Sequence, residues 1–172
     1  MKYIKNLKLL NYKINLTKKH WIHFVKTNCY AYALGLDIRE DKIKRHAYQP
    51  GVMSNYKHFI HFNSLFTYEH LINAIYADMD ALGIEIKLIK YDDKISDDSW
   101  KVALFITRYS KESNYLDDYH FLRYKNNAWY HKNGYDSFPS NKDDNYNIII
   151  NPKECYLKRR EYKGCYCLKI KR

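Results

Sequence analysis

The period of the hydrophobic pattern changes once along this chain, and that change is the strongest constraint on its fold. Within residues 67–82 apolar side chains recur at helical spacing, Thr67 is a natural N-cap and Gly83 can end the helix. Beyond this point the apolar residues alternate or form short runs suited to strands, at 84–89, 102–106, 119–124, 128–131, 148–150 and 165–170. Helices early and an antiparallel sheet later predict an α+β domain.

Length and composition indicate one domain over residues 1–172. A chain of 172 residues that is 46% hydrophobic can bury a real core, and no internal repeat or boundary divides it. Glycine and proline are scarce, at 5 and 3 residues, which argues against long linkers. Residues 1–20 are interpreted as a basic lead-in to the domain.

The N-terminal residues and the cysteines predict a protein that is cytoplasmic as synthesised. The first 16 residues contain several lysines and no apolar run of the length that a signal peptide needs. No stretch approaches the roughly 20 apolar residues of a membrane span. Without a signal peptide, the four cysteines are expected to be thiols instead of a disulfide framework.

Cys29 occupies a position that favours a thiolate. Asn28 can cap a short helix that continues to Leu34 and stops at Gly35. The unpaired N–H groups and the dipole at a helix start stabilise negative charge, so we expect a lowered pKa and a nucleophilic sulfur at Cys29. Its own N–H can also help to stabilise an oxyanion. The same position suits a small core residue, and that alternative stays open.

A predicted hairpin brings two histidines to one face of the sheet. If the turn is Lys125-Asn126, His120 lies directly opposite His131. If it is Asn126-Asn127, which tolerates the positive φ of a type I′ turn better, His131 is the diagonal neighbour of His120. Both two-residue turns keep the rings on one face, whereas a three-residue loop would separate them.

Two imidazoles on one face can form a base and its orienter. We expect His120 to accept the proton of Cys29, and His131 to fix the tautomer of His120 through one ring nitrogen. Without a nearby cysteine, the two histidines would be a cross-strand polar pair on a solvated face.

Taken together, these segments resemble the papain-like superfamily, and its NlpC-type branch fits best. The chain has Asn-Cys-Tyr-Ala-Tyr-Ala-Leu at 28–34, then a strand that begins at His120, and then His131 at the end of the next strand. The segments Asp-Tyr-His-Phe-Leu-Arg at 118–123 and Trp-Tyr-His-Lys-Asn-Gly at 129–134 also resemble small proteins of low-GC bacteria and their phages. The resemblance implies a papain-like fold, in which the Cys-bearing helix packs on an antiparallel sheet.

The resemblance also implies a function. It suggests a thiol hydrolase that cleaves peptide or amide bonds, often in cell-wall peptides, through Cys29, His120 and His131. Such a site forms a thioester acyl-enzyme, which water resolves, and it needs no cofactor. Peptide or peptidoglycan would be the substrate. A wall enzyme made in the cytoplasm would reach its substrate by lysis or in a virion, which suits a phage.

The match to this family is incomplete at two places. Tyr130 precedes the second histidine, and no plain upstream glutamine is available for an oxyanion hole. Asn28 or His23 is the candidate donor instead. Asn133 and Asp136 are alternatives to His131 as the third member of the site.

Metal binding is a rival use of cysteine and histidine, and the spacing argues against it. Cys165 and Cys167 form a C-x-C on one strand face, where inward packing is expected, and not the C-x-x-C of a zinc knuckle. Four other histidines show i, i+3 spacing without a flanking cysteine pair: His20, His23, His58 and His61. We therefore expect no metal.

A formal net charge of +11 supports a second hypothesis, a protein without catalysis. A basic surface attracts polyanions, and exposed tyrosines can stack on bases. The chain would then be a basic virion or ribonucleoprotein component that binds nucleic acid. The basic residues gather near the end of the chain, and a plain solvated face is the alternative for them: Lys158, Arg159, Arg160 and Lys163.

Overall fold

The computed structural model describes residues 27–36, 48–57, 60, 64–134 and 137–171. The basic lead-in and two candidate site residues, His23 and Asp136, lie outside these ranges.

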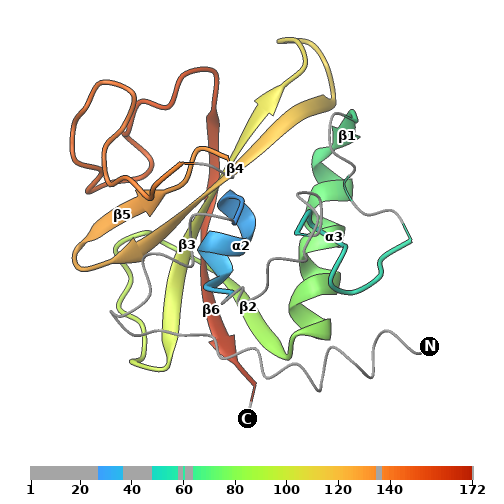
Figure 1. The fold of residues 1–172 in the computed structure, drawn as a ribbon, viewed down its shortest axis with the longest axis horizontal. Helices are drawn as coiled ribbons and strands as arrows, with labels where there is room; N and C mark the ends of the chain where they lie inside the picture. The colour runs from blue at the N-terminus through green and yellow to red at the C-terminus, as the bar shows by residue number, and fades with distance from the viewer. Residues whose placement is uncertain (1–26, 37–47, 58–59, 61–63, 135–136, 172) are drawn as a thin grey trace.

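The described residues form an antiparallel sheet accompanied by two helices. The helices are α2 (Cys29–Leu34) and α3 (Tyr68–Ala81). The strands are β1 (Phe66–Thr67), β2 (Ile84–Ile89), β3 (Ser99–Arg108), β4 (Tyr115–Lys125), β5 (Ala128–His131) and β6 (Glu161–Ile170). They follow the order β1-β4-β3-β6-β2, and β5 pairs with β4 on the same side as β1. The α+β class expected from the sequence is confirmed, with a curled sheet (Figure 1).

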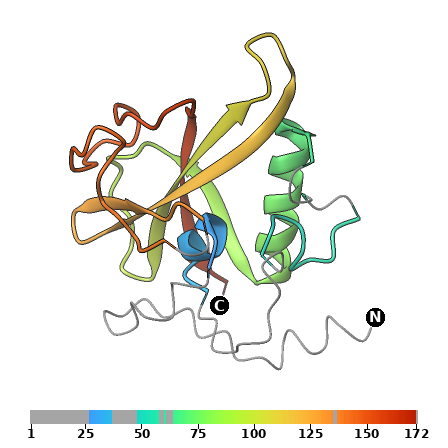
Figure 2. The same cartoon turned by 45° about the horizontal axis from the view of Figure 1, so that its top comes forward.

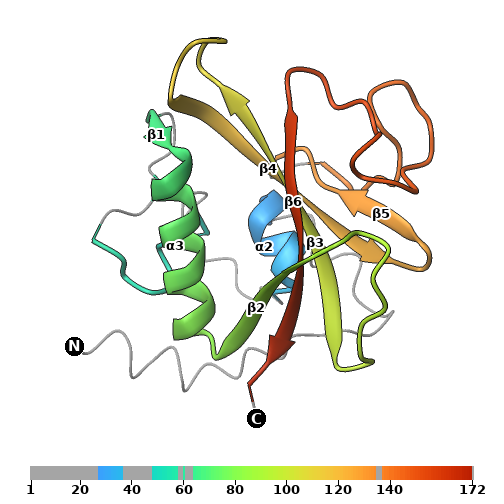
Figure 3. The same ribbon diagram turned by 180° about the vertical axis from the view of Figure 1, so that it is seen from behind.

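The two faces of the sheet are covered differently. Both helices pack on one face, as the two views in Figures 1 and 2 agree, and α2 lies against the middle of β4. Seen from behind, β6 and β2 cross in front of α2, and α3 stands to one side of them (Figure 3). The helix face contributes the larger core, which includes Tyr30, Leu71, Leu104 and Phe121. The opposite face is covered by the long connection between β5 and β6, through Ile149 and Leu157, among others.

Helix α3 forms where the sequence predicts it. Thr67 caps it by accepting the His70 N–H at 3.1 Å, and apolar residues of one stripe, such as Leu71 and Met79, are buried. The turn after the helix contains Gly83 at φ +66°, a left-handed conformation that favours glycine.

One expected strand is absent from the described part of the chain. At residues 148–150 only an isolated bridge forms, between Ile148 and Lys142. Asp143 accounts for this difference, because its Oδ1 accepts the backbone N–H groups of Asn145 and Asn147 at 3.0 and 2.9 Å. Such local hydrogen bonds compete with strand pairing and hold this segment in a turn.

The hairpin between β4 and β5 closes with the second of the two predicted turns. Asn126 and Asn127 have φ of 50° and 61°, and Lys125 pairs with Ala128. Two successive positive φ values are the signature of a type I′ turn. The register pairs Leu122 with His131, which makes His131 the diagonal neighbour of His120 on one sheet face.

We expect the turn to be sensitive to the residue at its second position. Asn127→Gly should raise the free energy of unfolding by about 0.5 kcal/mol, because glycine adopts positive φ without steric cost, and Asn127→Val should lower it by about 1 kcal/mol or more. Urea unfolding of the two variants measures both changes. Equal stability of the glycine and valine variants would contradict the assigned turn.

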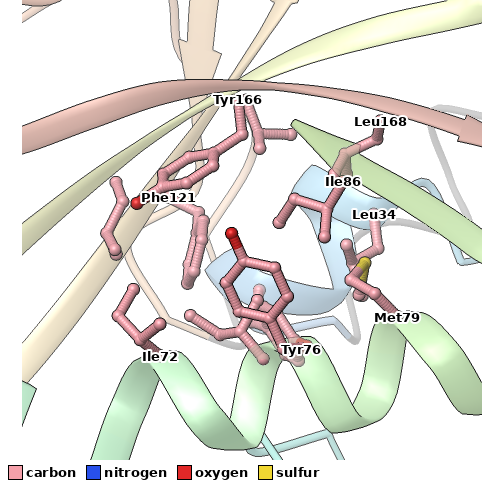
Figure 4. A pocket seen from close by; sticks show the side chains of 12 residues that line it. Leu34, Ile72, Tyr76, Met79, Ile86, Phe121, Tyr166 and Leu168 are labelled. Carbon is pink, nitrogen blue, oxygen red and sulfur yellow. The ribbon is translucent and has the colours of Figure 1, made fainter. Parts of the chain in front are cut away.

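The core between α3 and the sheet contains one narrow cavity (Figure 4). Its volume is about 10 Å³, and the side chains around it are apolar or aromatic, among them Ile72, Tyr76, Met79, Phe121 and Tyr166. A space of this size holds one water molecule at most. The cavity is therefore a packing gap on the helix face, and it offers no room for a ligand.

Candidate active site

Helix α2 presents Cys29 as its first residue, as expected from the sequence. Asn28 caps the helix, since its Oδ1 accepts the Ala31 N–H at 2.9 Å. Its Nδ2 donates to the Tyr48 carbonyl at 2.9 Å, and Gly35 ends the helix at φ +71°. The side chain of Asn28, an oxyanion candidate from the sequence, is thus engaged at both ends in holding α2 in place.

His120 and His131 form a hydrogen-bonded pair. His120 Nε2 lies 2.9 Å from His131 Nδ1, with the ring planes at 87°. His131 Nε2 lies 2.8 Å from the Lys142 carbonyl, which can only accept. A neutral His131 therefore carries its proton on Nε2 and accepts on Nδ1, so His120 donates from Nε2. This tautomer leaves His120 Nδ1 with a free lone pair, as a general base requires.

Both histidines are kept uncharged by their surroundings. Each ring is almost fully buried, and burial is the main cause that lowers the pKa of both, well below the usual range for His120. The Arg160 guanidinium lowers both pKa values further. For His131, the Lys142 carbonyl opposes this by stabilising the protonated ring.

The thiol of Cys29 lies against the peptide groups on either side of His120. Its Sγ is 3.9 Å from the Tyr119 carbonyl, and the Phe121 N–H also hydrogen-bonds to the sulfur. The sulfur can reach this backbone because β1 pairs with β4 only up to Leu116 and β5 only from Leu122.

The thiol makes no hydrogen bond to the His120 ring within the described residues. Alternation along β4 explains this. Tyr119 and Phe121 point into the helix-side core with Cys29, whereas His120 pairs with Phe105 and points to the opposite face. The structure therefore brings His120 and His131 together on the second face and places the sulfur against the β4 backbone beside His120, with no direct hydrogen bond between the thiol and either ring among the described residues.

Burial overturns the expected acidity of Cys29. The sequence predicts a lowered pKa at a helix start, but the pKa of this thiol is raised to about 12. Desolvation is the largest cause, followed by the charge of Asp118, and they outweigh Arg160 and the hydrogen bonds from backbone N–H groups. In this geometry Cys29 is a neutral thiol against the backbone of β4.

This acidity predicts a steep pH dependence of alkylation. Because the thiolate is the reacting form, the rate of Cys29 modification by iodoacetamide should rise about tenfold per pH unit between about pH 7 and pH 10. Site-resolved mass spectrometry measures this rate, and Cys29→Ser removes the signal. A plateau below about pH 8 would instead indicate a thiolate already formed at neutral pH.

Arg160 is a site residue that sequence reasoning placed on the basic surface. Its Nη1 donates to Asn133 Oδ1 at 3.1 Å, and its Nη2 lies 3.7 Å from Asp118 Oδ2. Asp118 stands two residues before His120 on the same face of β4. No sequence spacing links residue 160 to the hairpin, so only tertiary structure reveals this contact. Asn133, an alternative third member, is bonded to Arg160, and His131 is the residue that contacts His120.

Lys132 is a second residue that the sequence did not single out. Its side chain is fully buried, and its Nζ donates to the Thr27 carbonyl at 2.5 Å and to the Gly134 carbonyl at 2.8 Å. It ties the chain that enters α2 to the chain that leaves β5. The relative position of Cys29 and His131 depends on this link.

The other members of the basic cluster are mostly paired. Arg159 lies 3.4 Å from Asp117, and Lys163 lies 2.5 Å from Glu161 and over the Tyr68 ring. Lys158 is exposed. Pairing of this kind lowers the net positive charge that the cluster presents to a polyanion.

An open hollow of about 440 Å³ adjoins His131. His131 and Asn133 form one side of it, and the rest comes from the connection to β6: Ser140, Lys142, Asp143, Asp144 and Tyr146. The hollow reaches His131, whereas Cys29 and His120 do not line it.

The remaining cysteines and metal ligands give no second centre in the described ranges. Cys165 packs in the core of the second face with Phe105 and Leu122, as expected, and burial raises its pKa to about 12. No group of three histidine, cysteine, aspartate or glutamate side chains there is arranged to hold a metal ion.

No helix among the described residues is both long and apolar enough to span a bilayer.

Comparison with protein-family models, with curated proteins and with solved structures found no match to this chain.

Proposed function

We propose that this protein is a thiol hydrolase with a papain-like site, in which Cys29 is the nucleophile, His120 the base and His131 the orienter. One observation carries the proposal: the chain of hydrogen bonds from His120 Nε2 to His131 Nδ1, and from His131 Nε2 to the Lys142 carbonyl, at 2.9 and 2.8 Å. It selects the tautomer in which His120 Nδ1 can accept a proton, beside the peptide groups that contact the thiol.

The reaction needs a movement of the sulfur before it begins. For the proton to pass, Sγ would have to leave the Tyr119 carbonyl and come within hydrogen-bonding reach of the His120 ring. Substrate binding would favour this movement. A polar amide beside the sulfur offsets part of the desolvation that keeps the thiol protonated.

In the first half of the reaction, Sγ attacks the carbonyl carbon of a peptide or amide bond while His120 Nδ1 takes the thiol proton. The resulting imidazolium donates from Nε2 to His131, which spreads its charge into the hydrogen-bonded chain. His120 then returns the proton to the leaving amine, and a thioester remains on Cys29. Water, deprotonated by the same ring, attacks the thioester and releases the acid.

Gln49 is the candidate that best replaces the missing upstream glutamine as oxyanion donor. Its Oε1 accepts the hydroxyl of Tyr119, which leaves its Nε2 to donate. The preceding residue, Tyr48, is bonded through its carbonyl to Asn28, next to the nucleophile. The backbone N–H of Cys29 would be the second donor.

Peptides of the bacterial cell wall are the substrate class that the family resemblance suggests, and turnover tests the proposal. Purified protein should release new amines from peptidoglycan stem peptides, and Cys29→Ala should abolish the release. Unchanged release by this variant would reject the proposal.

A catalytically silent, basic nucleic-acid-binding protein is the second candidate, favoured by the net charge of +11 and by the neutral, buried thiol. If it is correct, affinity for single-stranded RNA or DNA should fall steeply between about 50 and about 200 mM salt, because each phosphate that the protein neutralises releases counterions. Fluorescence titration at both concentrations measures the fall. Absence of binding at the lower concentration would reject this candidate.

A further inference from the structure

Arg160 contacts two residues that flank the histidine pair in the sequence. Its guanidinium is anchored by Asn133, two residues after His131, and by Asp118, two residues before His120. Asp118 stands on the face of β4 that carries His120, because strand side chains two residues apart share a face, and Asn133 lines the same hollow as His131. Arg160 also influences the pKa of Cys29, His120 and His131, which places its charge near all three.

The positive charge of Arg160 is only partly neutralised by the residues that contact it. The separation from Asp118 is 3.7 Å, longer than the roughly 2.7–2.9 Å of a close charge-assisted hydrogen bond. Asn133 is a neutral acceptor, and a guanidinium carries five N–H donors in a planar fork that matches a carboxylate. The Arg160 side chain is 19% exposed, so a ligand can reach a guanidinium that is already largely removed from water.

We propose that Arg160 is a specificity-determining residue that binds a carboxylate of the substrate close to the scissile bond. The inference rests on the proposed thiol hydrolase and names its substrate class: peptides or amides with an acidic group next to the carbonyl that Cys29 attacks. The carboxylate would approach the open side of the guanidinium, loosen the contact with Asp118 and hold the acyl group at the sulfur. The overall positive charge of the protein favours the approach of such an anionic substrate.

Two alkylating reagents of nearly equal size test this without a known substrate. Iodoacetate carries a carboxylate and iodoacetamide a neutral amide, and each forms an S–C bond with the Cys29 thiolate while iodide leaves with the electron pair. The ratio of their rates at Cys29, divided by the same ratio for N-acetylcysteine amide, measures attraction of the carboxylate at constant pH near 9.

We expect Arg160→Gln to lower this ratio by about fivefold or more and Arg160→Lys, which keeps the charge but loses the fork, to lower it less. Arg159→Gln is the matched control, because it removes an adjacent charge that pairs with Asp117 away from the histidines, and it should leave the ratio unchanged. Thermal melting of each variant shows that it is folded, and the lysine variant keeps the comparison available if the glutamine variant is unstable.

Two other outcomes would overturn different statements. In the first, Cys29 reacts, but the ratio of the iodoacetate rate to the iodoacetamide rate is the same in wild type, Arg160→Gln and Arg159→Gln, or falls equally in both variants. The carboxylate site is then wrong, and the hydrolase proposal stands. If Cys29 reacts with neither reagent while the half-buried Cys167 does, the thiol is inaccessible, and both the hydrolase and the carboxylate site are rejected.

Discussion

Cys29→Ala is expected to lower kcat/KM for a peptide-amide substrate by at least about 10³-fold, and His120→Ala by a similar factor. The reason is that nucleophile and base act as one unit, so loss of either stops covalent catalysis and leaves only the contribution of binding. Single-turnover release of amine from a purified stem peptide measures both losses. Far-ultraviolet circular dichroism and thermal melting establish that each variant keeps its fold.

His131→Ala should have a smaller effect, about 10- to 100-fold, because His131 orients the base and takes no proton from the thiol. Its signature is a changed pH profile, since the His120 tautomer is no longer fixed. Asn133→Ala tests the alternative third member on the same segment, because Asn133 contacts Arg160 and not the His120 ring. A loss for Asn133→Ala greater than that for His131→Ala would contradict the assignment of the orienter.

Asp78→Ala is expected to lower the free energy of unfolding by about 3 kcal/mol. Asp78 is fully buried on α3 and accepts the Gly51 and Ser54 N–H groups, each at 2.7 Å, and the Tyr30 hydroxyl at 3.2 Å. Its removal leaves these donors without an acceptor in a site that excludes water. Because Tyr30 follows Cys29 on α2, the same change should also reduce turnover.

Urea unfolding measures the effect of Asp78→Ala, and the same helix provides the control. Asp80 is two residues away, but its side chain is 83% exposed and pairs with Lys171. Asp80→Ala should change stability little, because a solvated ion pair contributes little. Equal destabilisation by the two substitutions would show that the buried hydrogen bonds of Asp78 are not the cause.

Features set by neighbours in the sequence were predicted well. The caps at Asn28 and Thr67, the glycine that ends α2 and the two-asparagine turn each depend on a few consecutive residues. The placement of His120 and His131 on one face follows from that turn and from the strand period of two. These predictions succeeded because each feature depends on residues within a single helix, strand or turn.

Features that depend on distant segments were not predictable in this way. The acidity of Cys29 was mispredicted because its pKa depends on how deeply packing buries the sulfur, and helix position is the weaker influence. Likewise, the sulfur can hydrogen-bond to the backbone of β4 only because β1 and β5 pair with different parts of that strand and leave the residues between them accessible.

The sequence by itself thus determined the two helices, the turn between β4 and β5 and the face on which the histidines lie. Tertiary structure alone decided that Lys132 would join the start of α2 to the end of β5 and that Arg160 would contact Asn133 near the histidine pair. Both side chains are long, and their charged ends reach partners that are 105 and 27 residues away. Such contacts carry no local periodicity, so they become visible only when the folded chain brings the segments together.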